Sequence, residues 1–166
     1  MSQTRLSPRR LAPLAALAWL LAAQLPNAAN AADTPEPVPA ARPKADALAP
    51  ARAQLAQQRY AAAVAELRKV DGSNNADWNN LMGYALRKST PPDLDGAQRH
   101  YDTALRLNPQ HQGALEYSGE LALMKGDLAT AEARLATLSR LCSSPCEALD
   151  DLKQAIAKYK AAGGKR

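Results

Sequence analysis

The most reactive side chains in this chain are those of its two cysteines, Cys142 and Cys146, in the segment LCSSPCE. Three kinds of chemistry are open to such a pair: a structural disulfide, a redox-active dithiol, or part of a metal site. The spacing differs from the Cys-x-x-Cys pair of redox proteins, and a metal would need further soft ligands, for which only His111 and Met124 are candidates. An even cysteine count favours a bridge when a chain is exported, as the N-terminal residues described below predict, so we expect a disulfide and keep the other two roles as alternatives.

The remaining side chains with catalytic potential form no recognisable constellation. His100 and His111 fall on different predicted helices, with no acidic residue four positions further on. His100 stands among Gln98, Arg99 and Asp102, where we expect its ring to be solvated. The sequence has no glycine-rich phosphate loop, helical zinc motif or Ser-His-Asp pattern. We therefore expect a protein that is not an enzyme and has no cofactor.

The elements that must position these residues are helices. In the stretch 78–109, apolar residues recur at steps of three and four, which predicts two amphipathic helices. They are Trp78, Leu81, Met82, Ala85 and Leu86 in the first helix, and Leu94, Ala97, Tyr101, Ala104 and Leu105 in the second. Asn108 precedes Pro109 and is disfavoured in a helix, so the pair ends there. One helix pair cannot bury its apolar face alone, and further copies are expected.

The helix pair is repeated along the chain. Ala63, Ala97 and Ala131 are separated by 34 residues each, and Gly83 matches Gly119 at a spacing of 36. A 34-residue period of helix–turn–helix units is the signature of the tetratricopeptide repeat (TPR) family, which this part of the chain resembles. The matching residues are Gly83, Ala97, Tyr101, Ala104 and Pro109 in the second copy, and Gly119, Gly126-Asp127, Ala131 and Leu135 in the third. The cysteine segment also resembles an ending found in small exported bacterial TPR proteins.

The resemblance implies an all-α fold, a right-handed TPR solenoid of about three helix–turn–helix repeats plus a C-terminal capping helix. We place this domain at 47–162, with repeats at about 47–74, 75–109 and 110–142 and the capping helix at 145–162. Asn75 or Asp77 can cap the helix that begins the second repeat, and Gly126-Asp127 supplies a turn and a cap in the third.

In TPR proteins the first helix of each pair lines a concave groove that binds ligands. Carried over by position, the groove residues are Asp77, Asn80, Tyr84, Arg87 and Lys88 in the second repeat, and Glu116, Glu120, Leu123 and Met124 in the third. One wall is basic with an aromatic residue and the other is acidic with an apolar end, which suits a protein segment carrying both charges. The best-defined site of the family binds the terminal carboxylate of a peptide through lysines, asparagines and an arginine. Of these residues only one, Asn80, is matched in this chain. The alternative is that Arg87, Lys88, Glu116 and Glu120 form only a solvated helix face.

The residues before the domain are typical of export. Arginines precede an apolar run at 11–25, and the small residues Ala29 and Ala31 follow it. This pattern predicts a signal peptide at 1–31, cleaved after Ala31, because the run is shorter than the roughly 20 residues of a membrane span. An uncleaved anchor is the alternative. The proline-rich segment 32–46 is predicted to be a disordered linker.

Charge excludes one class of partner. The chain carries 21 basic and 16 acidic residues, but three of the arginines lie in the expected signal peptide, so its removal leaves a net charge of +2. Nothing in this balance indicates a nucleic-acid partner. We expect an exported protein, periplasmic in a double-membraned bacterium, that binds a protein partner and has no membrane span after cleavage. Self-association remains open, and the alternative function is thiol-redox or metal handling at Cys142 and Cys146.

Overall fold

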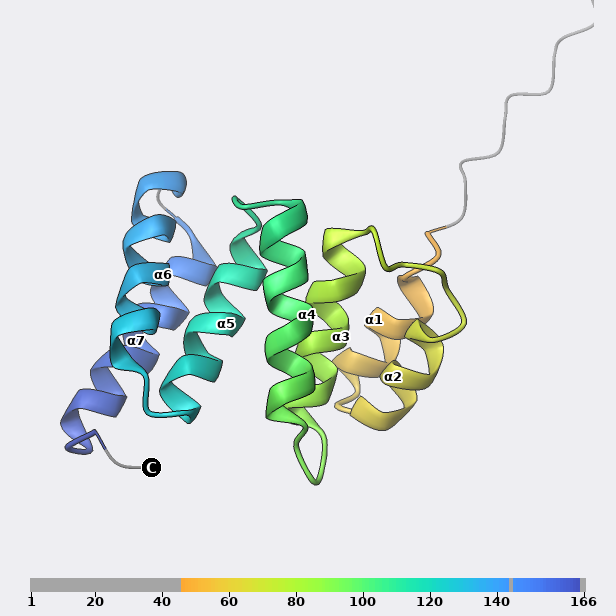
Figure 1. Cartoon of the computed structure of the whole chain (residues 1–166), viewed down its shortest axis with the longest axis horizontal. Helices are drawn as coiled ribbons and strands as arrows, with labels where there is room; N and C mark the ends of the chain where they lie inside the picture. The colour runs from red at the N-terminus through yellow and green to blue at the C-terminus, as the bar shows by residue number, and fades with distance from the viewer. Residues whose placement is uncertain (1–45, 144, 165–166) are drawn as a thin grey trace, which may run out of the picture. The chain divides into compact units, whose positions relative to one another are not determined.

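The structure, a computed structural model, describes residues 46–143 and 145–164. These residues form seven helices and no strand, which confirms the all-α class (Figure 1). The helices are α1 (Ala49–Ala56), α2 (Tyr60–Leu67), α3 (Ala76–Lys88), α4 (Leu94–Leu107), α5 (Gln112–Met124), α6 (Leu128–Leu141) and α7 (Glu147–Ala161). The expected signal peptide and all of the expected linker except Asp46 lie outside the described residues.

The helices pack in two rows. Each helix contacts its neighbour in the chain, and α7 also packs against α5. Within the described residues, α1 contacts α3 and α3 contacts α5, whereas α2, α4 and α6 do not contact one another. Helices α1, α3, α5 and α7 therefore form one row in which each helix contacts the next, and α2, α4 and α6 lie outside this row (Figure 1).

Side-chain caps fix where four of the helices begin. The N-cap residues of α3, α4, α5 and α6 are Asn75, Asp93, His111 and Asp127, and each accepts a bond of 2.7–3.1 Å from a backbone N–H in the first turn. The cap of α3 is thus Asn75 and not Asp77. Gly126 has a φ of +81° immediately before Asp127, which confirms the expected turn and cap between α5 and α6. Such caps satisfy N–H groups that have no partner inside the helix.

Small residues at repeated positions allow close helix packing. Ala63, Ala97 and Ala131, which are 34 residues apart, are all 0 % exposed. Gly119 on α5 faces Leu152 of α7, and a Cβ atom added to this glycine would lie 2.7 Å from Leu152 Cδ2. Leu152 and Ile156 are buried against α5 and α6, so α7 covers the end of the apolar core.

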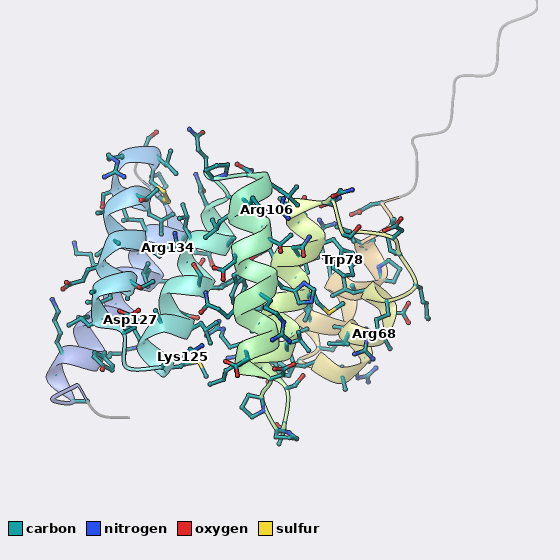
Figure 2. The ribbon with its side chains drawn as sticks, viewed as in Figure 1. Arg68, Trp78, Arg106, Lys125, Asp127 and Arg134 are labelled. Carbon is teal, nitrogen blue, oxygen red and sulfur yellow. A yellow bond between two sulfur atoms is a disulfide. The ribbon has the colours of Figure 1, made fainter. Side chains whose placement is uncertain are left out.

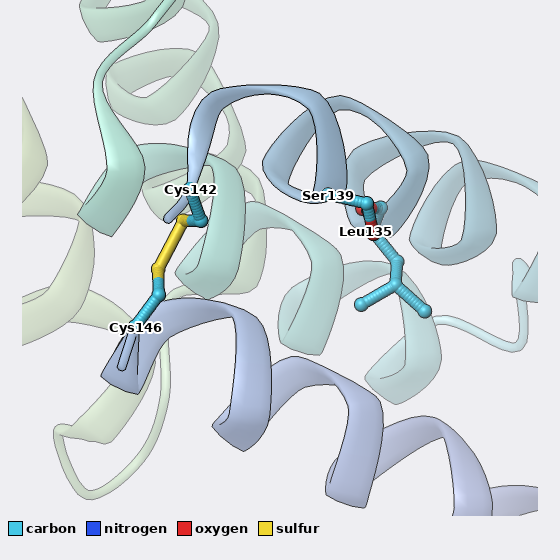
Figure 3. Close-up of a disulfide and its surroundings, with 4 residues drawn as sticks. All are labelled: Leu135, Ser139, Cys142 and Cys146. Carbon is cyan, nitrogen blue, oxygen red and sulfur yellow. A yellow bond between two sulfur atoms is a disulfide. The ribbon is translucent and has the colours of Figure 1, made fainter. Parts of the chain in front are cut away.

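Cys142 and Cys146 lie at disulfide distance. Their sulfur atoms are 2.11 Å apart, and their Cα atoms 5.8 Å (Figure 3). Cys142 follows the last residue of α6 and Cys146 is the N-cap residue of α7. The bridge therefore joins the end of one helix to the start of the next, as expected for a structural disulfide.

Candidate functional site

The central polar group on the row α1-α3-α5-α7 is the guanidinium of Arg87, whose side chain is 6 % exposed. Its Nη2 atom on α3 lies 2.5 Å from Oε2 of Glu120 on α5. Its central carbon lies 5.6 Å from the ring centroids of both Tyr84 and Tyr117. The ion pair with Glu120 and the cation–π contact with Tyr117 therefore link α3 to α5, and the contact with Tyr84 lies within α3.

The two tyrosines beside Arg87 belong to a larger tyrosine cluster formed by Tyr60, Tyr84, Tyr101 and Tyr117. Ring centroids are 4.7 Å apart between Tyr84 and Tyr117, 6.2 Å between Tyr60 and Tyr84, and 6.5 Å between Tyr101 and Tyr117. Tyr101 is fully buried, whereas the other three are partly exposed. Burial, and then the nearby Glu116 carboxylate, raises the pKa of Tyr117 to about 12, so its hydroxyl is neutral at physiological pH.

Three recesses open around this cluster. The tyrosine recess, about 310 Å³, is lined by Arg52, Leu55, Ala56, Asn80, Leu81, Tyr84 and Tyr117 of α1, α3 and α5. The methionine recess, about 340 Å³, is lined by Arg87, Glu120, Leu123, Met124, Ala155, Lys158, Tyr159 and Ala162 of α3, α5 and α7 with the residue that follows α7. The acidic recess, about 240 Å³, is lined by Gln112, Gly113, Glu116, Tyr117, Glu147, Ala148 and Asp151 of α5 and α7.

Most of the predicted groove residues meet here. Asn80, Tyr84, Arg87, Glu116, Glu120, Leu123 and Met124 each line one of the three recesses. Asp77 and Lys88 do not. Asp77 Oδ1 lies 3.0 Å from His111 Nε2, at the start of α5, and Lys88 is exposed beyond the recesses.

The predicted division into a basic and an acidic wall is wrong. Arg87 is bonded to Glu120 across the two helices, so these charges satisfy each other and do not face a ligand as separate walls. The alternative of a solvated helix face is also wrong for Arg87 and Glu116, which are 7 % and 8 % exposed. Of the four charged residues in that alternative, only Lys88 is exposed, and Glu120 is partly buried.

Glu116 is the unusual carboxylate of the site. Within the part of the chain that the structure describes, its side chain has no hydrogen-bond or ion-pair partner. Burial, then the carboxylates of Glu120 and Asp151, raises its pKa to about 8, while Arg87 acts in the opposite direction. Arg87 is itself paired with Glu120, so it offsets the effect of burial on Glu116 only in part.

His100 is not solvated as predicted. Its Nδ1 atom lies 3.0 Å from Oδ1 of the buried Asn79, and its ring packs edge-on against Trp78 at a centroid distance of 5.5 Å. Burial, then the charge of Arg99, lowers the pKa of His100 below its usual value. Trp78 (Figure 2) also donates from Nε1 to the Leu67 carbonyl at 2.9 Å, so this group ties α3 to α2 and α4.

The sequence matches no known protein-family model, and a comparison with curated proteins gives no match either.

Two kinds of recess residue were missed by sequence reasoning. Tyr117 occupies the position of Leu81 at the 36-residue offset that relates Gly83 to Gly119, so the repeat alignment contains a signal for it. Arg52, on α1, and Glu147, Asp151 and Tyr159, on α7, had no such signal. Their helices lie next to α3 and α5 only through tertiary packing.

The candidate metal ligands do not gather around the cysteines. His111 accepts a bond from the Ala114 N–H and faces Asp77, while the Met124 sulfur lies 3.8 Å from Arg87 Nη1. Cys142 packs against the apolar cluster of α5, α6 and α7. Among the described residues, no three His, Cys, Asp or Glu side chains are grouped so as to hold a metal ion. None of the seven helices has both the length and the apolar character needed to cross a bilayer.

Proposed function

We propose that this chain is a non-enzymatic binding module of the TPR type, which holds a segment of another protein across α1, α3, α5 and α7. The observation that carries this proposal is the position of Tyr84, Arg87 and Tyr117. These side chains stand between the tyrosine recess and the methionine recess, on the row formed by α1, α3, α5 and α7.

The composition of this surface is typical of protein–protein binding sites. Tyrosine and arginine are enriched among the residues that dominate binding energy, because they offer large contact areas and polar edges. Here their rotamers are already fixed by the Arg87–Glu120 ion pair and by the packing of the rings. A partner that docks on them would lose little further side-chain entropy from this protein.

The partner segment should carry large apolar side chains. Leu55, Ala56 and Leu81 give the tyrosine recess an apolar wall, and Leu123, Met124 and Tyr159 do so in the methionine recess. Each volume lies at the lower end of the roughly 300–1,000 Å³ range of ligand pockets. Recesses of this size suit individual side chains of a peptide.

Two observations support the finer parts of the proposal. The equal burial of Ala63, Ala97 and Ala131 at 34-residue intervals supports a TPR solenoid, since each would hold the same place in its helix pair. The Cys142–Cys146 pair supports export to an oxidising compartment, the periplasm if the source is a double-membraned bacterium.

Selection of binders from a displayed peptide library on the purified full chain tests this function. The selected peptides are then synthesised and their affinities measured by calorimetry. Tyr117→Ala should weaken them by about 30-fold or more, the effect of losing a dominant contact residue. Lys88→Ala, outside the recesses, is the matched control and should have no effect. The proposal fails if no peptide binds, or if Tyr84→Ala and Tyr117→Ala both leave the affinity unchanged while circular dichroism shows the variants folded.

A further inference from the structure

The acidic recess contains carboxylates without a balancing charge. Glu116 of α5 and Glu147 and Asp151 of α7 line it, and no lysine or arginine does. Glu147 and Asp151 are exposed at the opening, whereas Glu116 is 8 % exposed. The recess thus has a buried acid and two exposed ones, from two different helices.

The largely buried Glu116 offers a free acceptor to a ligand. A buried polar group is normally hydrogen-bonded. Glu116 finds no donor within the described residues, and its carboxylate oxygens keep contact with solvent where the side chain lines the recess. The charged groups that face it are Glu120, on its own helix, Asp151 and Glu147 on α7, and Arg87 on α3. Three of these four are acids, and Arg87 is bonded to Glu120.

We propose that the acidic recess binds the side chain of a lysine or arginine in the partner segment, with Glu116 as its main acceptor. This inference rests on the proposed function and specifies its partner. Glu147 and Asp151 attract the cation at the opening, and the ring of Tyr117 offers its face to the charged group. The aliphatic stem of the basic residue fills the rest of the recess.

The position of Tyr117 connects this recess to the rest of the binding surface. Its ring lines both the tyrosine recess and the acidic recess. A segment with an apolar side chain in the tyrosine recess can therefore place a neighbouring basic side chain beside Glu116. The recognised pattern is an apolar residue followed or preceded at short distance by a basic one.

The cation should bind better as pH rises. Glu116 must be ionised to attract it, and its pKa in the free protein is about 8. Below this pH, each binding event must release a proton from Glu116. Affinity should consequently increase by up to about tenfold per pH unit until the pH passes that value, and then level off.

The test uses the uncharged norleucine as the matched control for lysine. Nα-acetyl-lysine methylamide, the arginine analogue and Nα-acetyl-norleucine methylamide are titrated into the ¹⁵N-labelled full chain between pH 6.5 and 8.5. The backbone signals of Gly113 and Ala148 are followed. We expect the two cations to shift both signals, with tighter binding at higher pH, and norleucine to shift neither. Glu116→Gln should weaken the cations by about tenfold or more, whereas Asp95→Asn, on α4, should not.

The inference is overturned if norleucine acts like lysine, if no probe shifts these signals, or if Glu116→Gln binds as well as the unchanged chain. Failure of the proposed function gives a different experimental result from failure of this inference. Because the amino-acid probes do not need the rest of the tyrosine recess, they would still shift the signals of Gly113 and Ala148 if no library peptide bound. Selected peptides that need Tyr84 and Tyr117 but ignore Glu116 would leave the proposed function standing and refute the basic-residue site.

Discussion

Gly83 on α3 lies directly against the ring of Tyr101 on α4. A Cβ atom added to Gly83 would be 2.7 Å from Cε1 of that ring, closer than real side chains approach. Tyr101 is 0 % exposed, so its ring has no solvent-filled space into which it could move. The glycine thus sets the closest approach of the two helices, as the repeat pattern of the sequence suggests.

Gly83→Ala should therefore destabilise the protein, although alanine is the better helix former. We expect a loss of about 1–3 kcal/mol in the free energy of unfolding, as for other overpacked core sites, measured by urea denaturation. Gly113→Ala is the control. There the new Cβ would lie 3.1 Å from the Asn80 amide nitrogen, at the end of a flexible side chain. Equal stability changes in the two variants would contradict this account.

Glu120→Gln removes the charge partner of a buried guanidinium. Because the Arg87 side chain is 6 % exposed, we expect this change to cost about 1–3 kcal/mol of stability. Glu132→Gln breaks the pair between Glu132 and Lys160, whose side chains are 48 % and 53 % exposed, and should cost less than about 1 kcal/mol. The free energies of unfolding of both variants are compared by urea denaturation at low and high salt. A larger loss from the exposed pair would refute the role assigned to Arg87.

Glu116 should make stability fall as pH rises. Its pKa is raised from 4.5 in the unfolded chain to about 8 in the folded protein, so the folded state holds a proton that the unfolded state has lost between these values. Its stabilising contribution is complete below about pH 4.5 and decreases up to about pH 8, with a slope of at most about 1.4 kcal/mol per pH unit. Glu116→Gln should remove this slope. The free energy of unfolding of the variant, relative to that of the unchanged chain, should therefore increase from pH 5 to pH 8. Parallel stability–pH curves for the two proteins would contradict the prediction.

The Cys142–Cys146 bridge should stabilise the junction of α6 and α7 and little else. Closing so short a loop is worth about 2 kcal/mol in the chain-entropy model. Thiol titration should find no free thiols before reduction. The variant Cys142→Ala/Cys146→Ala should lose about 2 kcal/mol in the free energy of unfolding. Its amide hydrogen exchange should be faster at Leu152 and unchanged at Met82 on α3. Peptide affinity unaffected by reduction supports a structural bridge; loss of affinity on reduction favours a redox role.

A matched variant separates the bridge from the helix cap. Cys146 is the N-cap residue of α7 but makes no side-chain cap bond. Serine there can accept from the first turn, so Cys142→Ala/Cys146→Ser should regain about 0.5–2 kcal/mol relative to the double alanine variant. Identical unfolding midpoints would show that the start of α7 is not limited by its cap.

The sequence by itself determined the local parts of this structure. The periodic apolar residues predicted the helices, and Gly126-Asp127 predicted the start of α6, because turn and cap preferences depend on residues close in the chain. The 34-residue spacing of Ala63, Ala97 and Ala131 identified positions that are fully buried. The cysteine spacing pointed to the bridge.

Tertiary packing decided the chemistry of the surface. The sequence shows Arg87, Glu116 and Glu120 as similar charged helix residues, the two glutamates 29 and 33 positions after the arginine. Whether a charge is paired or isolated depends on which helices lie side by side and how deeply they bury it, and neither is encoded in local spacing. The fold bonds Arg87 to Glu120 and leaves Glu116 facing the acids of α7. It also brings Asn79 to His100, which makes a predicted surface histidine part of the packing between α3 and α4.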